Sequence, residues 1–119
     1  MAASEQSIRQ LIDSARYNKQ KDFAKVISFS TKAYNKAKAA KETKLEVESA
    51  FVHGMGNYLS GKYDECLRWY FESKRLYTTV KDTAGLAELY SDITIFYLRV
   101  KRFKDADEVS KRQFNIRKL

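Results

Sequence analysis

The residues best suited to do chemistry are one histidine, His53, and one cysteine, Cys66. A cysteine becomes a nucleophile when a neighbouring histidine or another positive group stabilises its thiolate and the site is open to solvent. A single histidine cannot form the multi-histidine site that many catalytic zinc ions require. The two residues therefore allow one kind of catalytic site, and their position in the fold decides whether it forms.

A second feature with chemical potential is the segment Gly54-Met55-Gly56. Phosphate-binding loops place their glycines between a strand and a helix, at a fixed spacing and with a lysine. Here the glycines fall inside a segment with helical periodicity, and neither that spacing nor the lysine is present. We expect Gly54 to allow a close helix–helix approach, and we expect no cofactor.

The formal net charge of +8 is unevenly distributed. Residues 16–44 carry nine basic and two acidic residues, residues 45–98 carry five and eight, and residues 99–119 carry eight and three. The basic ends could attract an anionic partner. Solvated helix faces are the simpler explanation of scattered lysines.

Nucleic-acid binding is the main alternative function. The basic runs suited to phosphate contacts are Arg99–Lys104, Lys111-Arg112 and Arg117-Lys118. No helix-turn-helix, sheet platform or arginine-rich motif accompanies them. Nucleic acid is therefore disfavoured as the partner.

The composition indicates a helical protein. The chain has 119 residues, of which 44% are hydrophobic, with no proline and four glycines, and this favours long uninterrupted helices. No apolar run approaches the roughly 18 residues that span a bilayer, and the N-terminus lacks the features of a secretory signal. A lone cysteine suits a reducing compartment. We expect a cytoplasmic all-α protein with no membrane partner.

The sequence contains three copies of one pattern at a regular spacing. The matching positions are the aromatic residues Phe23, Tyr63 and Phe103, the small or medium apolar residues Val26, Cys66 and Ala106, and the larger set Phe29, Trp69 and Val109. Each copy has the pattern helix, turn, helix. This pattern predicts six helices near residues 4–18, 22–39, 43–60, 62–79, 83–99 and 103–117.

Local signals mark some of the helix ends. Thr43 and Glu46 have the spacing of a capping box. Gly61 lies where a helix end needs a residue that tolerates positive φ. The register of Trp69 with Phe29 and Val109 predicts packing between repeats, not an exposed platform for stacking on bases.

The repeat resembles the tetratricopeptide-repeat (TPR) family. The second copy matches its motif positions best, with Ala50, Gly54, Gly61, Tyr63, Tyr70 and Ser73; the third copy supplies Tyr90, Ile93, Tyr97, Phe103 and Ala106, and the first keeps Tyr17, Phe23 and Ala33. The resemblance implies a single domain, residues 1–119, of three antiparallel helical hairpins stacked as a right-handed α-solenoid. The units are approximately 4–42, 43–82 and 83–119. The family positions of His53 and Cys66 face the core, which implies a packed pair and a protein that is not an enzyme.

The chain departs from the family in period and ending. The shortest TPR unit has about 34 residues and usually ends on a proline, whereas this unit has about 40 residues and no proline. The longer unit resembles the arrays of bacterial signalling and regulatory proteins. Because stacked repeats need a closing element, the uncapped end predicts a fragment of a longer protein or pairing with another chain.

The resemblance also implies a concave groove lined by the first helix of each unit. The predicted partner-binding residues are Phe51, Met55, Tyr58, Leu59, Ser91, Ile95, Leu98 and Arg99. An apolar groove with polar edges suits a peptide or a partner helix, so we expect a protein-interaction module that acts as a scaffold. The alternatives are that these side chains only pack on neighbouring helices, or that the uncapped end self-associates. The carboxylate clamp of chaperone-binding relatives is not expected, because the corresponding positions, such as Leu11 and Ala15, cannot donate to a carboxylate.

Overall fold

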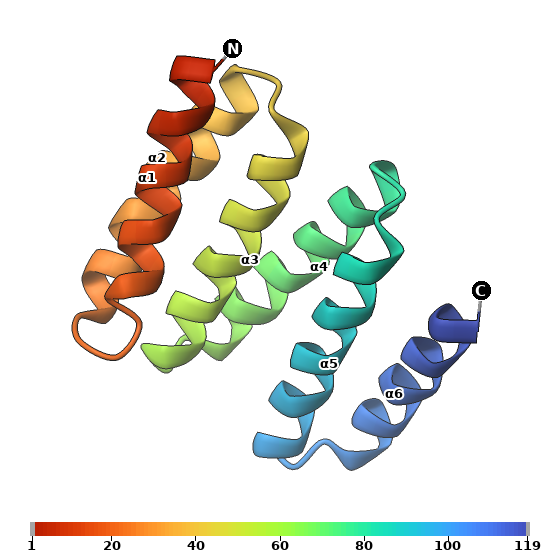
Figure 1. Ribbon diagram of the computed structural model, residues 1–119. Coiled ribbons are helices and arrows are strands. Elements are labelled where there is room, and N and C mark those ends of the chain that lie inside the picture. The colour runs from red at the N-terminus through yellow and green to blue at the C-terminus, as the bar shows by residue number, and fades with distance from the viewer. Residues whose placement is uncertain (1, 119) are drawn as a thin grey trace. The chain divides into compact units, whose positions relative to one another are not determined.

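The computed structural model is all-helical. It describes the backbone of residues 2–118 and the side chains of residues 4–112, and within them it contains six helices and no strand. The helices are α1 (Ala2–Tyr17), α2 (Phe23–Ala39), α3 (Thr43–Leu59), α4 (Tyr63–Thr79), α5 (Thr83–Arg99) and α6 (Phe103–Lys118) (Figure 1). The predicted all-α class and the six helices are confirmed, and each predicted boundary lies close to the observed one.

The turns between helices recur at equal intervals from α2 onward. One residue in each turn has positive φ: Lys41 (57°), Gly61 (80°), Lys81 (56°) and Lys101 (63°). In the first of these turns the N–H of Glu42 donates to the carbonyl of Ala37 at 2.9 Å, and the other three turns repeat this bond. This is the Schellman arrangement, which satisfies carbonyls at the helix end. The expectation for Gly61 is confirmed.

The N-terminal caps differ from the predicted capping box. Asp22 caps α2 by accepting from the N–H of Lys25 at 3.2 Å, and Asp82 caps α5 by accepting from the N–H of Gly85 at 2.9 Å. In α3 the N-cap residue is Glu42, with no side-chain cap hydrogen bond. The prediction for Thr43 and Glu46 is therefore wrong. The turn ends one residue earlier than that motif requires, so Thr43 is already helical.

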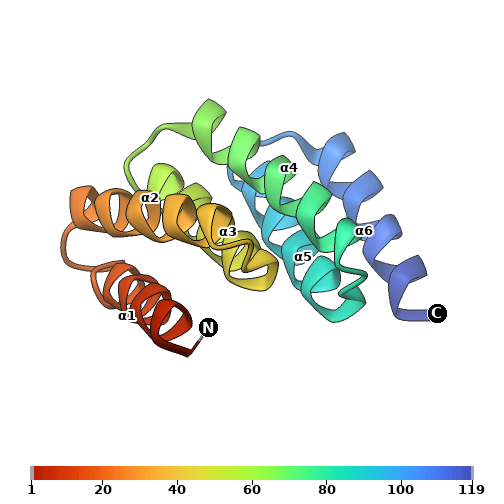
Figure 2. The same cartoon turned by 90° about the horizontal axis from the view of Figure 1, so that it is seen from above.

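The chain divides into two compact units, Met1–Leu76 and Tyr77–Leu119. In the first unit α1 and α2 run side by side in opposite directions, and α3 lies against both (Figures 1 and 2). The core of this unit contains Ile8, Ile12, Ala15, Val26, Ala33, Ala37, Leu45 and Val52. In the second unit α5 packs against α6, and the buried side chains of these two helices include Leu89, Ile93, Phe96 and Ala106.

Helix α3 is the most enclosed element of the first unit, and two glycines make its approach possible. A Cβ built on Gly54 would lie 2.7 Å from Cδ1 of Tyr70, and one on Gly56 would lie 2.8 Å from Cγ1 of Val26. Both distances are shorter than real Cβ contacts. The expected role of Gly54 in close helix approach is confirmed, and Gly56 has the same role against α2.

We expect Lys41→Gly to raise the free energy of unfolding by about 0.5–1 kcal/mol, because an L side chain is strained in the left-handed region. Gly61→Ala should lower it by about 1 kcal/mol through φ alone, since a Cβ there meets no atom within 4 Å. Urea unfolding measures both. Lys41→Ala is the matched control, which loses the charge but keeps the Cβ and should bring no gain. Equal gains from Gly and Ala at position 41 would contradict the backbone explanation.

Gly56→Ala should lower the free energy of unfolding by about 1–3 kcal/mol, because Val26 is fully buried and cannot move aside. Helix propensity alone would instead stabilise the variant by up to about 1 kcal/mol. Ser28→Ala, at an exposed position of α2, is the control and should change stability little. Thermal unfolding distinguishes the two effects, because the change in Tm of the Gly56→Ala variant is negative for the packing effect and positive for helix propensity.

Candidate binding faces

One face of α3 is less buried than the rest of the helix. The predicted groove residues Phe51, Met55, Tyr58 and Leu59 follow the spacing i, i+4, i+7 and i+8, and all four are half-buried. Lys44 and Glu48 lie on the same face by helical geometry. The structure therefore brings the four predicted residues of the second repeat to one side of α3.

Two of these four side chains also belong to the packing of the first unit. Phe51 and Met55 contact the hydrophobic core cluster. The ring of Phe51 stacks on that of Tyr70, with centroids 5.5 Å apart and planes at 20°. Removing either side chain would therefore affect the fold as well as any binding.

Tyr58 lies near the other end of this face, beside the turn to α4. Its ring centroid is 5.6 Å from that of Tyr63, whose side chain is exposed. Together with Leu59 these rings form an apolar edge at the end of the α3–α4 hairpin. Tyr63 was matched in the sequence as a repeat position and was not among the predicted groove residues.

Two arginines of α1 reach the α3 face. Nη1 of Arg9 lies 2.8 Å and Nη2 of Arg16 lies 3.4 Å from Oε1 of Glu48. The hydrogen bond that Arg9 donates to Glu48 raises the pKa of Arg9 above its ordinary value. Sequence reasoning missed this pairing, because the partners lie on different helices far apart in the sequence and no local spacing reveals it.

The second unit contains the other four predicted groove residues, on α5. Ser91, Ile95 and Leu98 follow the spacing i, i+4 and i+7, and Arg99 adjoins them. Ile95 and Leu98 are each 47% exposed, whereas Leu89, Ile93 and Phe96 on the opposite side of the helix are buried. This face carries the larger exposed aliphatic surface of the two.

His53 and Cys66 lie in packed surroundings. Cys66 has no exposed surface. Nδ1 of His53 lies 2.9 Å from Oγ of Ser30, and its ring meets the edge of Trp69 at a centroid distance of 4.6 Å. Burial lowers the pKa of His53, against a smaller opposing effect of Glu65. This environment favours a neutral imidazole.

Trp69 joins the first two repeats, as its register predicts. Its ring makes an edge contact with Tyr34 of α2 at 4.9 Å, in addition to the contact with His53 of α3. The indole is half-buried between these rings. Packing between repeats is therefore confirmed for Trp69.

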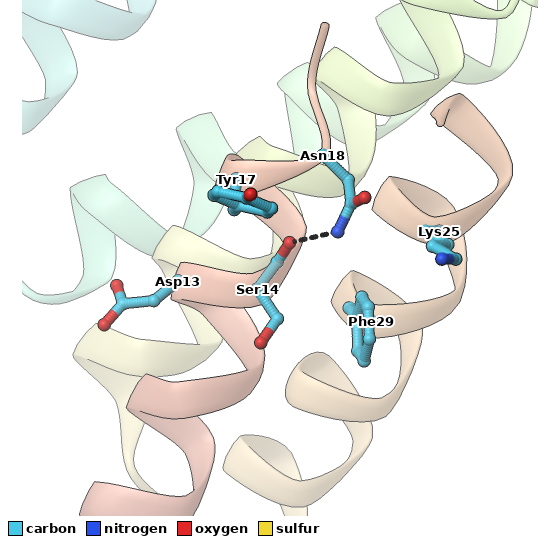
Figure 3. A pocket seen from close by; sticks show the side chains of 6 residues that line it. All are labelled: Asp13, Ser14, Tyr17, Asn18, Lys25 and Phe29. Atoms are coloured by element: carbon cyan, nitrogen blue, oxygen red, sulfur yellow. Dashed lines mark hydrogen bonds between the residues drawn. The ribbon is translucent and has the colours of Figure 1, made fainter. Parts of the chain in front are cut away.

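A surface hollow of about 400 Å³ lies between the end of α1 and the start of α2, lined by Asp13, Ser14, Tyr17, Asn18, Lys25 and Phe29 (Figure 3). The amide of Asn18 donates to the carbonyl of Ser14 at 2.8 Å, so it is engaged with the backbone. The carboxylate of Asp13 points away from Lys25 and Phe29 (Figure 3). The hollow therefore does not bring an acid and a base together.

Comparison with protein-family models, curated proteins and solved structures finds no match for this chain. Within residues 2–118 no helix is long and apolar enough to cross a membrane. The described side chains contain no group of three or more histidine, cysteine, aspartate or glutamate residues arranged to hold a metal ion.

The lowered pKa of His53 predicts a pH dependence of stability. In the unfolded chain its pKa is about 6.5, so as the pH falls through that value the unfolded state takes up a proton that the folded state binds less well. We expect stability to fall below about pH 6.5 and to level off below the folded-state pKa. His53→Gln is the comparison, because it retains a hydrogen-bonding group without the titration. The free energies of unfolding of the wild type and of the variant are measured from pH 7.5 to pH 5. The difference between them should change steadily as the pH falls, and a constant difference would contradict the assignment.

Proposed function

We propose that the chain is a protein-interaction module of three stacked TPR-like hairpins, which binds an amphipathic partner helix. The observation that carries the proposal is the pair Ile95 and Leu98 on α5, each 47% exposed on an otherwise well-packed helix. The regular repeat and the motif positions support the TPR-like arrangement.

The α5 face has the chemistry of a helix-binding surface. Covering the exposed half of two aliphatic side chains contributes about 1 kcal/mol each, because full burial of such a side chain is worth about 1.5–3 kcal/mol. Ser91 and Arg99 provide a polar edge beside them. A partner helix with apolar residues at i, i+3 or i+4, and i+7 matches the spacing of this face.

The α3 face of the first unit is a separate and smaller candidate binding surface. Tyr58 and Leu59 are its binding residues, whereas Phe51 and Met55 chiefly support the helix. Arg9 and Arg16 hold Glu48 in place beside this face. We further propose that the module belongs to a cytoplasmic regulatory or signalling protein, which its lone buried Cys66 and its long repeat support.

A library of amphipathic helical peptides displayed on phage tests the proposal. Selected peptides should carry apolar residues at the spacing given above. The double variant Ile95→Asp with Leu98→Asp should weaken their binding at least about 10-fold, because each charge would have to be desolvated. Fluorescence anisotropy measures the affinity.

Lys101→Glu with Lys104→Glu is the control, since both lysines are exposed and lie outside the α5 face. Loss of binding in this charge-reversal variant, with binding retained in the aspartate variant, would contradict the proposal. The selection could instead yield no peptide that binds with a saturable curve. If the apparent mass of the protein in light scattering also rises with protein concentration, the result would indicate self-association.

A further inference from the structure

Helix α2 has an unusual charge for this chain. Its sequence, FAKVISFSTKAYNKAKA, contains four lysines and no acidic residue, whereas each of the other five helices contains at least two carboxylates. The four lysines, Lys25, Lys32, Lys36 and Lys38, are all exposed. Positive charge is therefore concentrated on one element of the first unit.

The fold holds three of these lysines in a row. Lys25, Lys32 and Lys36 follow the spacing i, i+7 and i+11, which places them along one side of the helix with rises of about 10 Å and about 6 Å between them. Val26, Ala33 and Ala37, which directly follow the three lysines, have no exposed surface, so the buried side of α2 lies about 100° around the helix from the row. The row is thus presented by a helix that is anchored in the core.

The four lysines of α2 are not neutralised within the described part of the chain. The ammonium of Lys36 donates to the hydroxyl of Ser7 at 3.3 Å, and that of Lys38 lies 5.8 Å from the ring centroid of Tyr34. Neither contact cancels charge. Among the described side chains, no lysine of α2 forms an ion pair with a carboxylate.

The basic residues near the C-terminus differ in this respect. Arg102 pairs with Asp105 at 2.7 Å, Lys111 with Asp107 at 3.1 Å, and Arg112 with Glu108 at 3.3 Å. Each pair lies within a helical turn and lowers the field that an approaching anion meets. Lys111-Arg112 is therefore a poorer anion site than α2, and in the run Arg99–Lys104 the charge of Arg102 is offset.

We propose that the lysine row of α2 binds a nucleic-acid duplex through its phosphates, without reading the sequence. A duplex carries about one charge per 1.7 Å of its axis, so it can place phosphates against all three ammonium groups at once. The exposed Ser28 and Asn35 of the same helix add hydrogen-bond donors for phosphate oxygens. This binding is independent of the function proposed for α5.

The same face is poorly suited to other anionic partners. Phe23, the first residue of α2, is 41% exposed but lies on nearly the opposite side of the helix from the lysine row, so the row has no apolar anchor beside it of the kind that membrane-surface helices insert. The row also has no exposed aromatic ring beside it for stacking on unpaired bases, and α2 contains no arginine to grip a carboxylate. Closely spaced phosphates need only the point charges that lysines supply.

The test is the salt dependence of binding to a short DNA duplex of arbitrary sequence, about two helical turns long. The variant Lys25→Gln, Lys32→Gln and Lys36→Gln should weaken binding at least about 10-fold at about 50 mM salt. It should also reduce the slope of log K against log salt by about 0.9 for each lysine removed, since each lysine releases counterions from one phosphate. Changing the duplex sequence should leave the affinity the same within about twofold.

The matched control is the triple variant Lys104→Gln, Lys111→Gln and Arg112→Gln in α6. It removes the same number of positive charges, three, from the formal net charge of +8. This variant should keep the wild-type slope. Equal losses in the two variants would overturn the proposal, because net charge alone would then explain binding. Tighter binding to phosphatidylserine vesicles or to polyglutamate than to the duplex, lost in the α2 variant, would also overturn it and assign the row to that partner.

Discussion

The close packing of α3 is the constraint on which the first unit depends. This helix contacts α1 and α2 and also meets Tyr70 of α4, and it can do so because Gly54 and Gly56 present no Cβ where the neighbouring side chains lie. Protein interiors are packed as densely as organic crystals. The absence of a Cβ at these two positions therefore determines how the helices pack as strictly as a particular side chain would. The enclosure of α3 also explains its sequence, which lacks a clear polar stripe. Most of the circumference of the helix is covered, and the side that carries Tyr58 and Leu59 is partly open to solvent.

Much of the fold could be predicted from the sequence, because its signals are local and repeated. The aromatic residues at positions 23, 63 and 103 each begin a helix, and the apolar periodicity locates all six helices. The predicted capping box at Thr43 is wrong for a reason that is also local: the turn ends one residue earlier, so Thr43 is already helical.

The lysines at positions 41, 81 and 101 adopt the backbone conformation for which glycine is the usual signal, and a lysine residue gives no signal of this conformation. Their regular spacing in the series 41, 61, 81 and 101, which includes Gly61, is the one feature of the sequence that points to them.

The candidate faces could be predicted only as sets of positions. Helical spacing brings Ser91, Ile95 and Leu98 to one side of α5, but it does not distinguish Ile95, which is exposed, from Phe51, which packs into a core. That difference arises from neighbouring helices distant in the sequence. The same is true of charge. A count of basic residues favours both ends of the chain as anion-binding sites. Among the described side chains, however, α6 contains ion pairs and the lysines of α2 form none, and this difference depends on where each carboxylate lies.

The thin packing of the described side chains of α6, residues 103–112, has a consequence for how the second unit opens. Among its described side chains only Ala106 is buried, while Asp105 and Val109 are half-buried. Segments with few buried apolar contacts exchange their amide hydrogens through local opening, at a lower free energy than global unfolding. We therefore expect the amides of residues 103–112 to exchange before those of α5 and α3, and each opening uncovers the side of α5 that packs against α6. The transiently opened unit then exposes this side of α5 in addition to Ile95 and Leu98, and partly opened forms of this kind are prone to association with other chains.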